Sequence, residues 1–157
     1  MSNIRRATEK DAEAVGTMLT SLLAELYPDQ APDYRPERAI ETARALLDAD
    51  GYCAFLALMP DGEIGGVVGL SECKAIYAHG IFGEIVELYV KPEYRSAKVG
   101  ARLIDAAIAF ANAQGWSMLE VGAPDVPRWQ RTVDFYLRSG FTEIGPQLFL
   151  DLGKDPG

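Results

Sequence analysis

The sequence predicts an α+β fold: a mixed β-sheet with helices on both faces, in a single domain over residues 1–157. The length of 157 residues matches one domain of about 150 residues. Two helical patterns precede a hairpin of apolar strands, and a strand–helix–strand unit follows, which requires a parallel, right-handed crossover. We therefore expect a central sheet of six to seven strands, antiparallel at first and parallel in the middle.

The N-terminal third predicts one short strand and two helices. Residues 4–7 favour a strand. Thr8 is then expected to cap a helix, with Asp11 in the carboxylate position of a capping box. After a proline-rich loop, Pro36 suits the first turn of a second helix, and Gly51 is a typical terminator.

The rest of the chain alternates apolar runs of strand length with turns and helical patterns. The expected strands are 52–59, 64–73, 84–90, 118–121, 141–144 and 147–152, and the expected helices begin near residues 98 and 129. Residues 74–83 are expected to form an irregular connection. The expected strand 64–73 contains three glycines, Gly65, Gly66 and Gly69, which carry no side chains. They indicate a bulge or a close backbone approach.

Composition excludes several functional classes. The net charge is −8 and no basic run exists, so nucleic-acid binding is not expected. No apolar run is long enough to span a membrane, and the N-terminus lacks a signal-peptide pattern. One histidine and two cysteines argue against a metal site or a disulfide framework. We expect a cytoplasmic protein with reduced thiols; the sequence leaves open whether it forms a homodimer.

The stretch from Gly83 to Phe110 carries the chemistry. A strand ends, a tight turn follows, and a helix begins, so unpaired backbone N–H groups and the positive end of the helix dipole face the turn. The residues there are small and Arg95 adds a cation, which together favour an anion such as phosphate. An ordinary strand–helix turn remains the alternative, because such glycine patterns are weak signals.

Two motifs in this order resemble the GNAT superfamily of N-acetyltransferases. Its acetyl-CoA signature reads V-x-P-x-x-R followed by R/Q-x-x-G-x-G/A, and Val90, Pro92, Arg95 and Gly100 fall in place. Residues 135–141, FYLRSGF, resemble the family's FYxxxGF about forty residues downstream. The order of elements is similar across nearly the whole chain.

The chain departs from the family pattern at two positions. Lys98 stands where the first glycine of the pair is usual, and its side chain limits the backbone. Trp129 stands where many members have Asn, so the positioning role of that Asn is in doubt. Both departures keep open a non-catalytic acyl-CoA-binding module.

The resemblance implies acetyl-CoA as cosubstrate and no metal. It implies that the pantetheine arm pairs with the strand that ends at Val90, and that a backbone N–H polarises the thioester carbonyl. The implied cofactor-binding residues are Leu88, Tyr89, Val90, Arg95, Ser96, Ala97, Lys98, Val99, Gly100, Ala101 and Phe135. An amine then attacks directly, without a protein nucleophile, so Cys53 and Cys73 are expected to be core residues.

The resemblance to the FYxxxGF motif makes Tyr136 the candidate general acid for the departing thiolate. If the motif is disregarded, a tyrosine packed on an amphipathic helix is the simpler interpretation. Glu84 and Glu87 are candidate bases for the ammonium acceptor. Their odd spacing puts them on opposite faces of a regular strand, unless a bulge intervenes. His79 is a third candidate.

These observations predict an N-acetyltransferase that moves an acetyl group from acetyl-CoA to a primary amine, with a cationic small molecule as acceptor. A protein lysine or N-terminal acetyltransferase is the rival within enzymes. The acidic net charge and the two glutamates favour a cationic acceptor.

Overall fold

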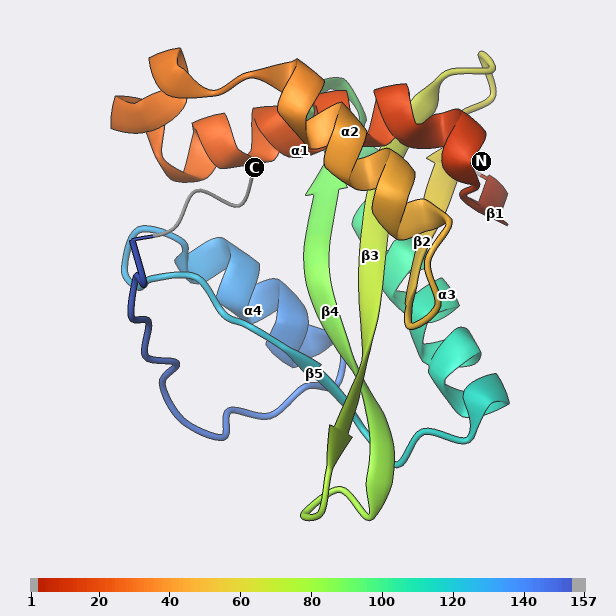
Figure 1. Cartoon of the computed structure of the whole chain (residues 1–157), viewed down its shortest axis with the longest axis vertical. Coiled ribbons are helices and arrows are strands. Elements are labelled where there is room, and N and C mark those ends of the chain that lie inside the picture. Colours follow the sequence, from red (N-terminus) through yellow and green to blue (C-terminus); the bar gives the residue numbers. More distant parts are fainter. Residues whose placement is uncertain (1–2, 154–157) are drawn as a thin grey trace.

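One five-stranded sheet forms the centre of the protein, in the order β1-β2-β3-β4-β5 (Figure 1). The computed structural model describes residues 3–153. The first four strands are antiparallel neighbours, and β5 pairs with β4 in parallel. The strands are β1 (Asn3–Arg6), β2 (Tyr52–Leu58), β3 (Ile64–Ala75), β4 (Gly80–Val90) and β5 (Leu119–Val121).

Helices cover both faces of the sheet, as the sequence predicts. α1 and α2 lie together across one face, and α3 packs against the opposite face (Figure 1). The α-helices are α1 (Ala12–Leu26), α2 (Pro36–Leu47), α3 (Val99–Gln114) and α4 (Gln130–Arg138). Three short 3-10 helices, η1 (Glu9–Asp11), η2 (Pro28–Asp33) and η3 (Pro92–Ala97), occupy connecting segments.

Two buried clusters hold these layers together, one on each face of the sheet. Under α3, Val68, Leu70 and Ile85 of the sheet pack with Leu103 and Ile104 of the helix. Under α1 and α2, a second cluster joins residues Ala12, Val15, Met18, Ala43, Leu56, Val67 and Tyr89. The alternation of these side chains along β3 and β4 fixes which face each residue presents.

The sheet has five strands rather than the expected six to seven. The expected strands 141–144 and 147–152 are wrong: no regular secondary structure follows α4 among the described residues. Strand-forming side chains need a partner strand, and β5 is only three residues long. Ile144 and Leu148 are accordingly 81% and 92% exposed.

The expected irregular connection over 74–83 is also wrong. β3 and β4 continue past the expected ends and form a long hairpin, closed by a short turn at residues 76–79. His79 takes a φ of 57° there and is exposed. Ten residues of β3, from Gly66 to Ala75, pair with ten residues of β4, in continuous register except at one irregularity.

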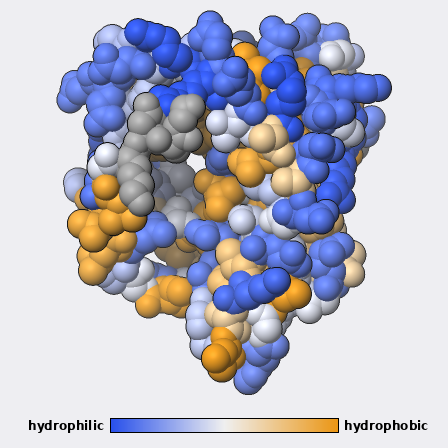
Figure 2. All heavy atoms as spheres, viewed as in Figure 1, coloured by the Kyte–Doolittle hydropathy of each residue, from blue (hydrophilic) through white to orange (hydrophobic). Residues whose placement is uncertain are grey.

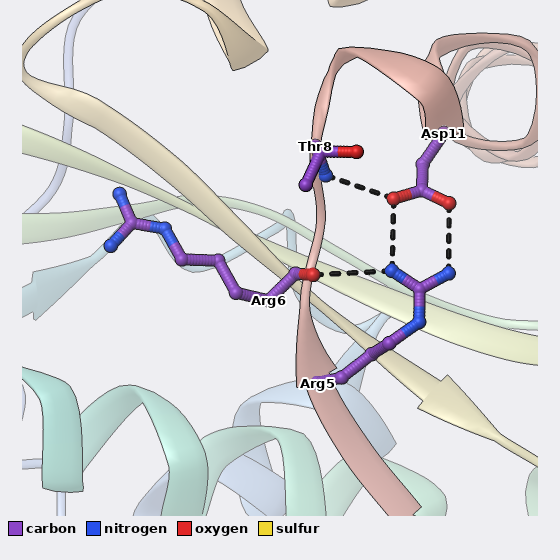
Figure 3. A network of polar contacts seen from close by, with 4 residues as sticks. All are labelled: Arg5, Arg6, Thr8 and Asp11. Carbon is purple, nitrogen blue, oxygen red and sulfur yellow. Dashed lines mark hydrogen bonds and ion pairs between the residues drawn. The ribbon is translucent and has the colours of Figure 1, made fainter.

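The expected cap at Thr8 is present, although a 3-10 turn precedes α1 (Figure 3). The Thr8 N–H donates to Asp11 Oδ2 at 2.8 Å. The same carboxylate accepts from both Nη atoms of Arg5, at 2.8 and 2.9 Å. This network joins β1 to η1, the 3-10 turn that leads directly into α1.

The surface is hydrophilic over α1 and α2, whereas apolar side chains gather at the tip of the β3–β4 hairpin and along the C-terminal segment (Figure 2). Within residues 3–153, no helix combines the length and apolarity that crossing a membrane requires.

Candidate active site

The outer edge of β4 is open over its second half. The Lys91 N–H donates to Gly65 O at 2.9 Å, toward β3. Because backbone groups alternate along a strand, those of Leu88 and Val90 point to the opposite edge. β5 pairs only with the first half of β4, and the chain after β5 diverges from β4 (Figure 1). An extended ligand can therefore add to β4 beyond the end of β5.

A β-bulge at Val86 places the two candidate bases on one face of the sheet. Glu84 stands opposite Ser71, Glu87 stands opposite Gly69, and Val86 has no partner between them. Ser71 and Gly69 are two residues apart on β3, so they share a face, and so do the glutamates. The bulge is the exception that the sequence argument left open, so the opposite-face placement of a regular strand does not apply here. Both carboxylates lie on the α1–α2 face.

Glu87 is held by a residue of another strand. Tyr52 Oη donates to Glu87 Oε2 at 2.5 Å in a half-buried setting. The missing side chain of Gly69 makes room for this bond, since a Cβ there would collide with Tyr52 Oη and crowd Glu87 Oε2. The predicted close approach at Gly69 is thus confirmed.

Glu84 lies beside a second carboxylate that the sequence argument missed. It stands in register with Glu120 of β5, on the same face of the sheet. The Tyr77 hydroxyl donates to Glu120 Oε1 at 2.9 Å. These charges raise the pKa of Cys73, after burial, so the thiol is close to both glutamates. Cys73 is only half-buried, whereas Cys53 is a core residue as expected.

The segment that leads from β4 into α3 is exposed next to the open edge of β4. Ser96, Ala97 and Lys98 are exposed, and Val99 is fully buried as the anchor of the turn. Lys98 takes a φ of 58° and is the residue that precedes the helix. This left-handed conformation favours glycine. A lysine at this position therefore has a conformational cost that the usual glycine of the family pattern does not have.

Arg95 is bound by α1. Its Nη2 atom donates to both carboxylate oxygens of Glu25, at 2.7 and 2.9 Å, and its Nε atom donates to Val90 O at 2.8 Å. The guanidinium carbon lies 5.5 Å from the ring centroid of buried Tyr89. The hydrogen bond to Glu25 raises the pKa of Arg95, and burial opposes that rise. Phosphate binding by this side chain stays a prediction.

α4 brings Tyr136 and Phe135 to the α3 face of β4. Tyr136 is buried and its ring packs against Phe135 and Phe141, at centroid distances of 5.6 and 5.9 Å. Burial raises the pKa of Tyr136 to about 12, so the phenol is a proton donor and not a base at neutral pH. A Cβ on Gly100 would lie 3.4 Å from the Phe135 ring, which places this ring beside the first turn of α3.

The two remaining positions lie at the margins. Trp129 precedes the first residue of α4, with the guanidinium carbon of Arg128 5.1 Å from its ring centroid. His79 lies in the turn at the far end of β4 from Val90, away from the open edge. Among residues 3–153, no cluster of three His, Cys, Asp or Glu side chains is arranged to hold a metal ion.

Solved structures share this fold. An aminoglycoside acetyltransferase from an uncultured soil metagenomic sample superposes with a TM-score of 0.78 over 98% of this chain and 97% of its own, at 20% identity. An acetyltransferase structure from an Arthrobacter species gives a TM-score of 0.76 at 26% identity, over 96% of this chain and 95% of its own. The fold is that of an N-acetyltransferase.

The sequence itself matches the Acetyltransferase (GNAT) family over residues 17–141, so the chain belongs to that family. It is 29% identical to the aminoalkylphosphonate N-acetyltransferase of Salmonella typhimurium strain LT2, over 89% of this chain and 84% of that protein. The expected family is confirmed. The protein is an acyltransferase of the N-acetyltransferase class.

Proposed function

We propose that this protein transfers an acetyl group from acetyl-CoA to the primary amine of a small molecule. The observation that carries the proposal is the open, bulged half of β4. The exposed N-terminus of α3 lies beside the end of this strand, and the carboxylates of Glu84 and Glu87 lie on the face of the sheet opposite α3. The relative that acts on aminoalkylphosphonates supports a small amine as acceptor.

The cosubstrate fits the residues on the α3 side of β4. Leu88 and Val90 offer backbone groups to the pantetheine arm, and the N–H groups of the first turn of α3 face the position of the pyrophosphate. The small, exposed residues Ser96, Ala97 and Ala101 allow the backbone there to be approached closely, and exposed Lys98 adds a positive charge. When bound, acetyl-CoA supplies the activated acetyl group as a thioester.

The acceptor approaches from the α1–α2 face. Glu84 and Glu120 stand in register there, and two like charges side by side favour an ammonium group between them. Glu84 is the better base, because Tyr52 already donates to Glu87. Glu84 accepts a proton from the ammonium, directly or through water, and the free amine attacks the thioester carbonyl.

Tyr136 supports the other half of the reaction. Its buried phenol lies on the opposite face of β4 from the two glutamates, and its raised pKa keeps the proton in place. It donates that proton, or a hydrogen bond, to the departing thiolate. The base on one face of β4 and the acid on the other suit a reaction at the open edge between them: the amine approaches from the glutamate side, and the proton donor for the thiolate lies on the Tyr136 side.

A cytoplasmic location and a homodimer stay predictions.

Thiol release from acetyl-CoA tests the function. The panel contains an aminoalkylphosphonate, an aminoglycoside, a simple diamine and a lysine-containing peptide, each at neutral pH. We expect turnover with a small amine and none with the peptide. Turnover with the peptide alone would establish a protein acetyltransferase instead, and acetyl-CoA binding without any turnover would establish a binding module.

A further inference from the structure

Glu25, in the last turn of α1, bonds to the one arginine of the cosubstrate signature although it lies seventy residues away in the sequence. We propose that Glu25 is a positioning residue for acetyl-CoA: it holds Arg95 against the end of β4 and so fixes the edge to which the pantetheine arm adds. This inference rests on the proposed function, because it concerns the same site.

The contacts of Arg95 leave it little freedom. Its Nη2 atom is bound by both oxygens of Glu25, and its Nε atom is bound by Val90 O, the last carbonyl of β4. Val90 O is one of the backbone groups that point outward from the open edge of β4. Because Arg95 already donates to this oxygen, an added strand cannot pair with it there. A ligand strand then finds the Leu88 groups and the Val90 N–H as its partners.

Glu25 also acts on Tyr89, the residue over whose ring Arg95 lies. After burial, the charge of Glu25 is the main reason that the pKa of Tyr89 is raised, so its carboxylate lies near that buried phenol. Tyr89 belongs to the strand that receives the cosubstrate, and Arg95 lies over its ring. The Glu25 carboxylate of α1 thus bonds to Arg95 of the signature loop and lies near Tyr89 of the strand.

The placement of Glu25 couples the two halves of the site. Glu25 is the penultimate residue of α1, the helix on the face from which the acceptor is proposed to approach, and η2 begins three residues later. Arg95 belongs to η3, which leads into the first turn of α3. Two nitrogens of the planar guanidinium are bound, Nη2 by Glu25 and Nε by Val90 O, and this fixes the orientation of the group as well as its distance.

Calorimetric titration of the full chain with CoA tests the inference in the parent, Glu25→Gln, Arg95→Gln and the double variant. Asp11→Asn is the matched control, because it breaks another carboxylate–arginine pair, which lies away from β4's open edge. We expect Glu25→Gln to weaken CoA binding about fivefold. It should have no further effect in the Arg95→Gln background, and Asp11→Asn should bind as the parent does. In turnover, KM for acetyl-CoA should rise while kcat changes less than about twofold.

Two results would overturn the inference. Tighter CoA binding by Glu25→Gln would mean that the carboxylate competes with the cosubstrate for Arg95. Unchanged binding, with a fall in Tm like that of Asp11→Asn, would make the pair a structural contact only. A parent chain that binds no CoA would instead refute the proposed function itself, and this inference with it.

Discussion

Tyr52 and Glu87 form a 2.5 Å hydrogen bond between β2 and β4, over the strand that separates them. The bond exists because Gly69 of β3 has no side chain beneath it. Burial, followed by the charge of Glu87, raises the pKa of Tyr52 well above its ordinary value. The phenol therefore remains a donor throughout the physiological range, and the Glu87 carboxylate has a permanent partner.

Replacement of Tyr52 by Phe should destabilise the protein by about 1.5 kcal/mol, because it leaves a half-buried carboxylate without its donor. Urea denaturation followed by circular dichroism measures the loss. Tyr77→Phe is the control, since that hydroxyl bonds to Glu120 at an exposed position, and it should leave stability unchanged. Equal stability of Tyr52→Phe and parent would show that solvent replaces the bond fully.

Glu84→Gln should lower kcat/KM most at neutral pH and recover as the pH rises. An alkyl ammonium has a pKa near 10.4, so free amine accumulates in alkaline solution and the base becomes dispensable. Glu87→Gln should have the smaller effect, because Tyr52 already holds that carboxylate. The pH profiles of kcat/KM for the parent and both variants decide the matter. Parallel profiles would remove both glutamates from proton transfer.

The bulge at Val86 shows what a single sequence predicts and what it does not. Periodicity correctly located the strand and the two glutamates, but a regular period of two assigns them to opposite faces. One unpaired residue reverses that assignment, and no side chain in this stretch announces it. The glycines of β3 were the only available signal, and they pointed to the right part of the sheet.

Contacts between distant segments were the hardest to foresee. Motif spacing located Arg95 and the first turn of α3, because these residues are neighbours in the sequence. The partner of Arg95 comes from α1, where Glu25 looks like any solvated helix charge. Glu120 was missed for the same reason, since only strand pairing brings it beside Glu84. The expected C-terminal strands failed because apolar composition predicts a strand only where a partner edge exists.

Lys98→Gly should stabilise the protein by about 0.5–1 kcal/mol. A left-handed residue with a side chain costs about 1–2 kcal/mol, and the greater entropy of glycine in the unfolded chain offsets part of the gain. Lys98 adopts this conformation at the start of α3. Lys98→Gln is the control, because it removes the charge and keeps the strain, so it should not stabilise. A glycine variant no more stable than the glutamine variant would contradict the expectation.

Asp11→Asn should reduce stability at neutral pH and lose that effect in acid. The hydrogen bond from Arg5 is the main reason that the pKa of Asp11 lies below its ordinary value of 3.8. A carboxyl whose folded-state pKa is lowered contributes stability above its unfolded pKa and loses it as the pH falls through the folded value. Because the Arg5 side chain is 43% exposed, we expect only about 0.5–1 kcal/mol at pH 7. Unfolding free energies of parent and variant should converge as the pH falls through the lowered folded-state pKa of Asp11. A constant difference would exclude the ion pair as its source.

Tyr136→Phe should lower kcat while CoA affinity stays close to that of the parent. General-acid catalysis contributes about 10²–10⁴-fold, and a thiolate is a good leaving group, so the reduction should lie near the low end. Since burial raises the pKa of Tyr136 to about 12, the phenol keeps its proton until well above pH 10. The parent should therefore show no loss of kcat from this residue between pH 8 and about pH 10. Stopped-flow thiol release, with CoA titration of the same samples, separates chemistry from binding. An unchanged kcat on a verified amine would make Tyr136 a packing residue of the cluster that it forms with Phe135 and Phe141.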